Sequence, residues 1–174
     1  NAERFVKSDC EFVIAGNGPL TEELKAQCRS ERVHFVGRLS DEELRLYHYA
    51  ASVFAFPSVT KNEAFGVALA EAMYCGTPAV TFTIPGSGVN WVSLNGETGI
   101  EVPNGDDEAY AEAIDKLVED KELNKQYGAA GHQRVVENFT IPKMMAAQEK
   151  CYKELSEMRV MITKRGGKYN PIYF

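Results

Sequence analysis

The sequence lacks the residue patterns that hold metal ions or disulfide bonds in most small proteins. Its four cysteines lie far apart, and no two of them form the CxxC spacing of a zinc or redox site. The three histidines show no HExxH-type spacing. We therefore expect free thiols in a reducing compartment and no metal site.

Long hydrophobic runs and an excess of positive charge are also missing. No apolar run approaches the roughly 20 residues of a membrane span, and no secretory leader opens the chain, so a cytoplasmic location is expected. The formal net charge of −6 disfavours nucleic acid as a partner, because phosphate contacts require clustered Lys and Arg. With 174 residues, 44% of them hydrophobic, the chain suffices for one domain with its own core.

What the sequence does contain is a regular alternation of short apolar runs and helical patterns. Strands are predicted at residues 11–15, 33–36, 52–56, 79–83 and 99–102, and helices at 19–28, 41–51, 66–74, 106–119, 122–137 and 142–157. Ser40 and Glu43 form a capping box before the second helix. Strands that are separated by single helices imply an α/β fold with a parallel sheet and helices on both faces.

One predicted helix, residues 66–74, carries a single ionisable side chain, Glu71, among apolar neighbours. This composition predicts a helix that is buried on most of its surface, where a carboxylate requires a partner. In one interpretation Glu71 caps a loop or pairs with a lysine. In the other it binds a ligand, because ligands of open parallel sheets lie beyond the carboxyl ends of the strands, where this helix begins.

The start of this helix has the features of a diphosphate site. Its first N–H groups carry partial positive charge and have no intrahelical acceptors. Gly66 allows close approach of the backbone to a phosphate. Glu63 precedes the helix and Glu71 follows two turns later, so one carboxylate suits the transferred group and the other suits ribose hydroxyls.

Other loop residues are less specific. Gly16 and Gly18 belong to a GxG turn, but Thr21 stands where a dinucleotide fingerprint has its third glycine, so an ordinary turn is equally expected. Arg38 either neighbours a nucleobase or is solvated. Lys61 either contacts phosphate or balances the charge of Glu63. The chemistry of the Pro85–Gly88 turn is open.

Residues 57–80, PSVTKNEAFGVALAEAMYCGTPAV, closely resemble the signature of the group-1 (family 4) glycosyltransferases, which has two glutamates separated by seven residues. The resemblance extends to FVIAGNGPLTEEL, VHFVGRLSDEELRLYHYA and NGETGIEVPNGDDEAYAEAI and covers roughly residues 10–155. The combination is highly specific, whereas a lone E-x7-E would not be.

The resemblance implies a GT-B fold, in which two Rossmann-like domains face each other across a cleft. This chain would be the single C-terminal, donor-binding domain over residues 1–174, with a core at about 10–157 and a tail at 158–174. The implied activity is transfer of a sugar from a nucleoside-diphosphate donor with retention of configuration, in polysaccharide biosynthesis, without a metal cofactor.

The resemblance also implies roles for individual residues. Glu63 would contact the donor sugar as the catalytic residue, and Glu71 would bind the ribose. The backbone of Phe65, Gly66 and Val67 would hold the diphosphate. Gly16 and Gly18 would line the cleft, and Arg38 would lie near the base.

Two family features are expected to be absent: an Arg- and Lys-bearing strand upstream of residue 11, and the N-terminal acceptor-binding domain. We therefore expect a domain truncated at its N-terminal edge, inactive alone, weak in nucleotide binding and prone to self-association through the open sheet edge. The basic patch at 164–168 would dock on the missing domain, contact an anionic membrane surface, or belong to a frayed tail.

Two alternatives remain open: a GT-B-type nucleotide-sugar epimerase, and a non-catalytic nucleotide-sugar-binding module. A response-regulator-like domain is disfavoured, because no acidic cluster follows the first strand. The base, the sugar and the acceptor are not determined by the sequence.

Overall fold

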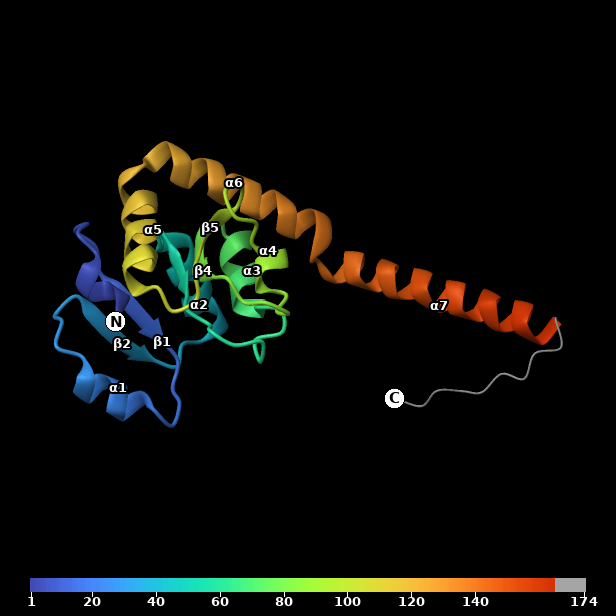
Figure 1. The fold of residues 1–174 in the computed structure, drawn as a ribbon, viewed down its shortest axis with the longest axis horizontal. Helices are drawn as coiled ribbons and strands as arrows, with labels where there is room; N and C mark the ends of the chain where they lie inside the picture. Colours follow the sequence, from blue (N-terminus) through green and yellow to red (C-terminus); the bar gives the residue numbers. More distant parts are fainter. Residues whose placement is uncertain (165–174) are drawn as a thin grey trace. The chain divides into compact units, whose positions relative to one another are not determined.

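A computed structural model describes the backbone of residues 1–164 and the side chains up to residue 158. The chain divides into two compact units, Asn1–Val135 and Val136–Phe174. Figure 1 shows the first unit as a mixed α/β structure and the described residues of the second unit, up to Lys164, as helical. The basic patch predicted at 164–168 and most of the predicted tail lie outside the described side chains.

The predicted elements are present, with small shifts at their ends. The strands are β1 (Phe12–Ala15), β2 (Val33–Gly37), β3 (Phe54–Phe56), β4 (Ala79–Phe82) and β5 (Gly99–Val102). The helices are the 3-10 helix η1 (Ala2–Phe5), α1 (Thr21–Gln27), α2 (Asp41–Ala50), α3 (Val67–Tyr74), α4 (Val89–Val92), α5 (Asp107–Glu119), α6 (Lys121–Asn138) and α7 (Ile141–Lys164). Sequence patterns missed η1 and α4, because each is a single turn, too short for a helical period.

All strands pair in parallel, but they form two sheets instead of the one that was predicted. One sheet contains β1 and β2, and the other has the order β3-β4-β5. No ladder joins β1 to β3 within the described residues. An alternation of strands and helices predicts parallel pairing but does not state which strands are neighbours, so the split was not visible in the sequence.

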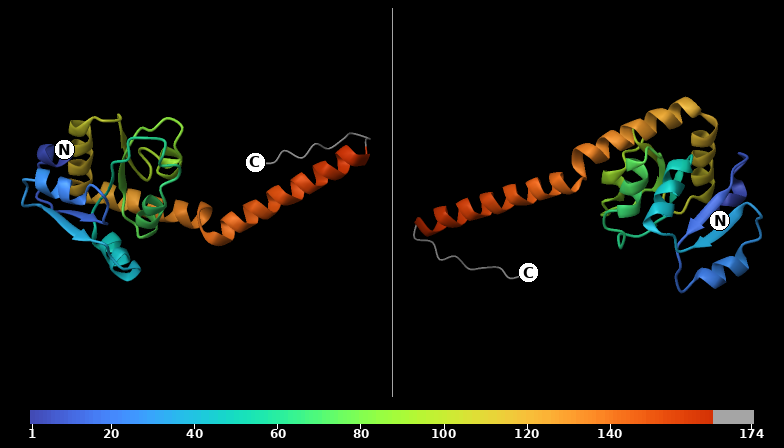
Figure 2. Two further views of the ribbon diagram at one scale, coloured as in Figure 1. Left: turned by 90° about the horizontal axis from the view of Figure 1, so that it is seen from below. Right: turned by 180° about the vertical axis from the view of Figure 1, so that it is seen from behind.

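The core lies around the three-stranded sheet. Every residue of β4 is buried, and because neighbouring side chains point to opposite faces, both faces of this strand are covered. Helices α3 and α5 both pack against β4. The hydroxyl of Tyr110 on α5 donates to the carbonyl oxygen of Val80 at 2.8 Å, which fixes α5 on the sheet. Figure 2 shows these helices around the sheet from two further sides.

Strand β1 differs from its prediction as a buried strand. Val13 is 45% exposed and Ile14 is 42% exposed. The apolar run of β1 is typical of a strand that is buried on both faces. In the structure, however, β1 belongs to the two-stranded sheet, and most of its side chains are exposed among the described residues.

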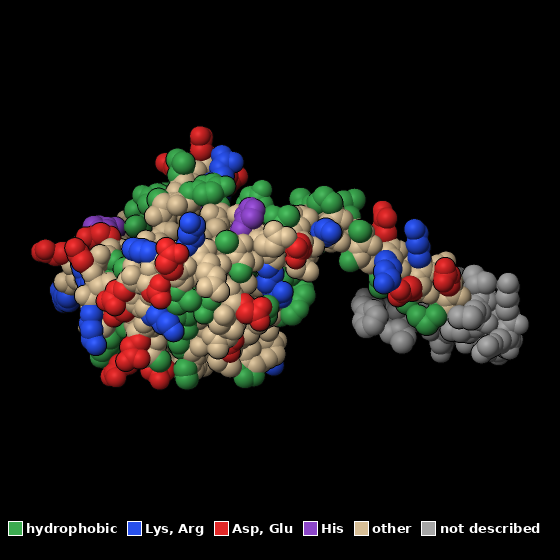
Figure 3. All heavy atoms as spheres, turned by 90° about the horizontal axis from the view of Figure 1, so that it is seen from above, with side chains coloured by type: hydrophobic (Ala, Val, Ile, Leu, Met, Phe, Trp, Pro, Cys, Tyr) green, Lys and Arg blue, Asp and Glu red, His purple; other side chains and the backbone are tan. Residues whose placement is uncertain are grey.

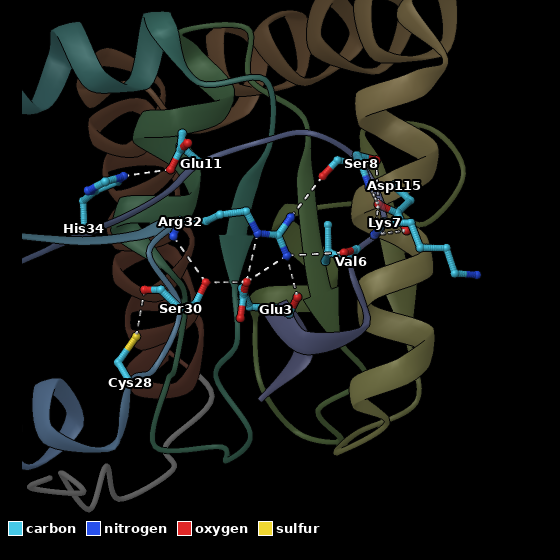
Figure 4. A network of polar contacts seen from close by, with 10 residues as sticks. All are labelled: Glu3, Val6, Lys7, Ser8, Glu11, Cys28, Ser30, Arg32, His34 and Asp115. Atoms are coloured by element: carbon cyan, nitrogen blue, oxygen red, sulfur yellow. Dashed lines mark hydrogen bonds and ion pairs between the residues drawn. The ribbon is translucent and has the colours of Figure 1, made fainter.

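A network of polar contacts surrounds the N-terminal segment that leads into β1 (Figure 4). Arg32, which precedes β2, donates to the Glu3 carboxylate at 2.8 Å and to the Ser8 carbonyl oxygen at 3.1 Å. Asp115 on α5 accepts hydrogen bonds from the Ser8 hydroxyl at 2.6 Å and from the Lys7 N–H at 3.1 Å. The segment thus connects the two-stranded sheet to a helix of the three-stranded sheet.

The predicted capping box of α2 is confirmed: Ser40 accepts from the Glu43 N–H, and the Glu43 carboxylate accepts from the Ser40 N–H. In the second unit, α7 runs to Lys164, beyond the predicted end at residue 157, since no Gly or Pro interrupts that stretch. None of the described helices combines the length and hydropathy that crossing a membrane requires.

Candidate functional site

The amino-terminal end of α3 is open. Its N-cap residue is Gly66, in the left-handed region at φ 88°, and none of the described side chains caps the helix there. The Ala70 N–H makes the first helical bond, to the Gly66 carbonyl oxygen at 3.1 Å. The N–H groups of the first three helical residues therefore have no intrahelical acceptor. Val67, the first of them, is 65% exposed, so this positive helix end is accessible to an anion.

Glycine fits position 66, the N-cap, without strain, whereas a residue with a Cβ atom would be strained there. A positive φ of this size is disfavoured for residues with a Cβ atom. A Cβ at this position would also lie 3.2 Å from the Cβ of Leu69 and 3.5 Å from the ring of Phe56. The glycine thus permits both the turn into α3 and its packing against β3.

Glu63 lies directly at this helix start. Its Oε1 accepts a hydrogen bond from the Gly66 N–H at 3.0 Å, and its own N–H donates to the Thr60 carbonyl oxygen at 3.1 Å. The side chain is half-buried. The carboxylate satisfies the N–H of the N-cap residue, whereas the N–H groups of the first helical turn remain available for a ligand.

Glu71 is on the same helix but is exposed, contrary to the prediction that α3 is buried on most of its surface. The exposed positions Val67, Ala68, Glu71 and Tyr74 form one face of the helix, and Leu69, Ala72 and Met73 form the buried face. Apolar composition alone does not specify which face of a helix is covered. The helix start and Glu71 consequently belong to one accessible surface.

A buried histidine lies beside this surface. His48 on α2 is 6% exposed, and its ring packs edge-on against Phe54 with centroids 5.3 Å apart. Its Nε2 is buried and has no hydrogen-bond partner within the described part of the chain. Burial lowers the pKa of His48, and the nearby Glu71 carboxylate partly counteracts this effect.

The other predicted site residues lie on loops. Gly16, at φ 116°, donates its N–H to the Gly37 carbonyl oxygen at 2.7 Å, so the ends of β1 and β2 meet immediately before Arg38. The Gly18 N–H donates to the Thr21 hydroxyl at 2.8 Å, which forms an ordinary tight turn. No hydrogen bond among residues 1–158 joins these loops to the Glu63 and Gly66 pair.

The cationic candidates, Arg38 and Lys61, are both exposed, and neither forms an ion pair in the part of the chain that the structure describes. Phe65 contacts the Trp91 ring in an edge-on arrangement with centroids 6.3 Å apart.

Residues 1–158 contain no group of three or more His, Cys, Asp or Glu residues placed to hold a metal ion. Figure 3 shows acidic and basic side chains interspersed over one face of the first unit, without a continuous basic surface.

Sequence reasoning missed the residues that hold the Glu63 segment from the opposite side. The Ser87 hydroxyl donates to the Glu63 carbonyl oxygen, and the Gly88 N–H donates to the Ala64 carbonyl oxygen at 2.8 Å. The Pro85–Gly88 turn was noted in the sequence, but nothing there indicated its contact with residues more than twenty positions away.

Comparison with known proteins agrees with this fold. The profile of the family described as glycosyl transferases group 1 matches residues 2–134. The D-rhamnosyltransferase WbpZ of Pseudomonas aeruginosa is 34% identical over 136 residues, which cover 76% of this chain and 35% of that protein. The O-antigen chain mannosyltransferase C of Escherichia coli is 30% identical over 156 residues, covering 88% of this chain and 42% of that protein.

Solved glycosyltransferase structures share the same arrangement. Sucrose-phosphate synthase from Thermosynechococcus elongatus superposes with a TM-score of 0.72 at 29% identity, covering 84% of this chain and 38% of that one. Anabaena HepE, solved in complex with UDP and glucose, gives a TM-score of 0.76 at 21% identity, covering 90% of this chain and 43% of that one.

These matches confirm the predicted α/β, GT-B-type fold class. The chain spans less than half the length of each of these relatives. Since the family profile covers most of the first unit, the chain belongs to the group 1 glycosyl transferases.

Proposed function

We propose that this chain binds a nucleoside-diphosphate sugar and takes part in transfer of the sugar with retention of configuration. The observation that carries the proposal is the open amino-terminal end of α3, with Glu63 at its N-cap and Glu71 on its exposed face. The O-antigen relative and HepE, solved with UDP and glucose, support this ligand class and a role in polysaccharide biosynthesis.

In the proposed complex the N–H groups of the first turn of α3 bind the diphosphate. Their partial positive charge stabilises the negative charge that develops on the departing diphosphate when the bond to the sugar breaks. Such preorganised donors do this without a metal ion. Arg38 near the base and Lys61 near the phosphates remain candidate contacts, since both are exposed and form no ion pair among the described residues.

The two carboxylates are proposed to act on either side of the diphosphate. Glu71 accepts hydrogen bonds from the ribose hydroxyls, and such bonds to a charged acceptor contribute about 1.5–3 kcal/mol. Glu63 contacts the donor sugar, since it is fixed at the N-cap beside the phosphate position. Glu63 thus contacts the sugar, which is the part of the donor that reacts, and Glu71 contacts the ribose, which takes no part in the bond changes.

The first prediction concerns Glu71. Glu71→Ala weakens nucleoside diphosphate binding by roughly 10–100-fold, because the ribose hydroxyls lose their charged acceptor. Isothermal titration of the longest natural protein that contains this chain measures the effect. Glu112→Ala, at an exposed glutamate on α5, is the matched control and keeps the wild-type affinity. Equal affinities for Glu71→Ala and the control, with both proteins folded, contradict the ribose role.

The second prediction concerns Glu63. Glu63→Gln retains an oxygen that accepts from the Gly66 N–H but removes the negative charge, whereas Glu63→Ala removes both. Both substitutions lower kcat more than they weaken nucleotide affinity, and Glu63→Ala has the larger effect. Steady-state kinetics with a labelled donor and acceptor test this. A Glu63→Gln enzyme with unchanged kcat rules out a catalytic function of the charge.

The same product assay separates the alternatives. A nucleotide-sugar epimerase converts the donor without joining it to an acceptor, and a non-catalytic binding module leaves the donor unchanged. Formation of a glycoside whose anomeric configuration matches that of the donor supports the proposal.

A further inference from the structure

The turn between β4 and α4, residues 84–88, contacts the Glu63 segment through its backbone and one side chain. The Ser87 hydroxyl donates to the carbonyl oxygen of Glu63 itself, and the Gly88 N–H donates to the Ala64 carbonyl oxygen at 2.8 Å. The carbonyl groups of two consecutive residues, Glu63 and Ala64, are therefore held by this turn.

The contact is too close to accommodate a side chain at residue 88. A Cβ on Gly88 would lie 2.5 Å from the Ala64 carbonyl oxygen and 3.4 Å from the Phe65 Cα. The φ of Gly88 is −77°, a value that any residue adopts. Glycine is thus required here by proximity to the Glu63 segment and not by backbone conformation.

The turn itself is fixed to the core. The Asn90 side chain accepts from the Ile84 N–H at 2.8 Å and donates to the Phe82 carbonyl oxygen at 3.0 Å, at the end of the fully buried strand β4. The Ser87 hydroxyl also accepts from the Val89 N–H at 3.2 Å, which orients its own hydrogen toward Glu63. A continuous set of hydrogen bonds therefore runs from β4 to the backbone of Glu63.

We propose that Ser87 and Gly88 are positioning residues for Glu63: they hold the backbone of residues 63 and 64 so that the Glu63 carboxylate stays at the α3 N-cap. The inference rests on the proposed function, in which Glu63 contacts the donor sugar. Glu71 is held by α3 and does not depend on this turn. Loosening the turn consequently affects turnover and not nucleotide affinity.

The test compares Ser87→Ala with Ser87→Thr, which retains the hydroxyl, and with the control Ser52→Ala, at an exposed serine outside the site. The expected kcat of Ser87→Ala falls roughly 10–100-fold, since small misplacement of a reacting group has effects of this size. The Kd for nucleoside diphosphate stays at the wild-type value, and Ser87→Thr restores most of the kcat. Gly88→Ala, which displaces the Ala64 carbonyl, lowers kcat in the same direction.

Amide hydrogen exchange provides a readout that does not require activity. Ser87→Ala is expected to speed exchange at residues 63–66 while residues 70–74 within α3 keep their protection. Unchanged exchange at 63–66, or a kcat equal to wild type, overturns the inference. Failure of the wild-type protein to transfer any sugar counts against the proposed function instead, and the exchange experiment then still decides whether Ser87 holds Glu63.

Discussion

At the scale of single residues, the site depends on polar groups whose hydrogen bonds are only partly satisfied by the residues that the structure describes. The N-cap Gly66 is satisfied by Glu63, but it provides no side chain for the first turn of α3. His48 shows the same feature at a buried position, because its Nε2 has no partner among the described residues. An unsatisfied group that is buried, as in His48, lowers stability, whereas the N–H groups at the exposed start of α3 are available to a ligand.

His48 gives a prediction for the pH dependence of stability. Its pKa is lowered in the folded protein, so the unfolded chain takes up a proton more readily. The native state is therefore favoured above the ordinary histidine pKa of about 6.5 and loses stability as the pH falls below that value. In His48→Leu this loss between about pH 7 and pH 5 is smaller than in the wild-type protein.

Chemical denaturation at several pH values measures this difference. His132→Leu is the comparison, since His132 is exposed and its Nδ1 forms a hydrogen bond with the Tyr74 carbonyl oxygen. A His48→Leu protein with the same pH dependence as wild type would show that His48 does not contribute to it.

At the scale of elements, helix α6 approaches the segment that connects α3 to β4 without intervening side chains. A Cβ on Gly128 would lie 2.1 Å from the Gly76 carbonyl oxygen, whereas a Cβ on Gly131 would lie 3.6 Å from atoms of Met73, an ordinary contact. Glycine is therefore required at the first position and replaceable at the second. Close packing at Gly128 holds the far end of α3, whose amino-terminal end forms the site.

Gly128→Ala is expected to destabilise the protein by about 1–3 kcal/mol, because the added methyl group forces the two segments apart. Gly131→Ala is the matched control and is neutral or stabilising by up to about 1 kcal/mol, since alanine favours a helix over glycine. The free energy of unfolding from denaturant titration gives both values. Equal stabilities for the two variants would contradict the close approach of α6 to Gly76.

The sequence predicted the elements well because their signals are local. Apolar runs placed β2, β4 and β5, and the Ser40 capping box placed the start of α2. The exposure of β1 and the separation of the two sheets were not predicted, since they depend on which strands become neighbours. Within the site, the Glu63 and Glu71 spacing was visible, but Ser87 contacts Glu63 across 24 residues, and no local pattern reports such a contact.

At the scale of the whole molecule, side-chain hydrogen bonds connect the two sheets of the first unit, since no β-ladder joins these sheets within the described residues. Arg32 and Asp115 both bind the segment before β1, and this segment links the two-stranded sheet to α5. Burial alone would raise the pKa of Asp115, but hydrogen bonds from Ser8 and Lys7 lower it overall. The ionised carboxylate is thus favoured in the folded unit.

Asp115→Asn is expected to reduce the free energy of unfolding at pH 7 by about 1–3 kcal/mol, since the amide replaces an acceptor-only group that receives several hydrogen bonds. Because the pKa of Asp115 is lowered, its contribution is present above the ordinary carboxyl pKa of about 3.9 and is lost as the pH falls through that region. The variant therefore loses less stability than wild type between about pH 5 and pH 3. Glu112→Gln on the same helix serves as the control, and a wild-type pH profile for Asp115→Asn would contradict the link.

The most direct test of the central claim is a crystal structure of the longest natural protein that contains this chain, grown with a bound nucleoside diphosphate. We expect the diphosphate oxygens to accept hydrogen bonds from the N–H groups of Val67 and Ala68, with both ribose hydroxyls on the Glu71 carboxylate. A nucleotide that is bound elsewhere, with the first turn of α3 facing only solvent, would contradict the account.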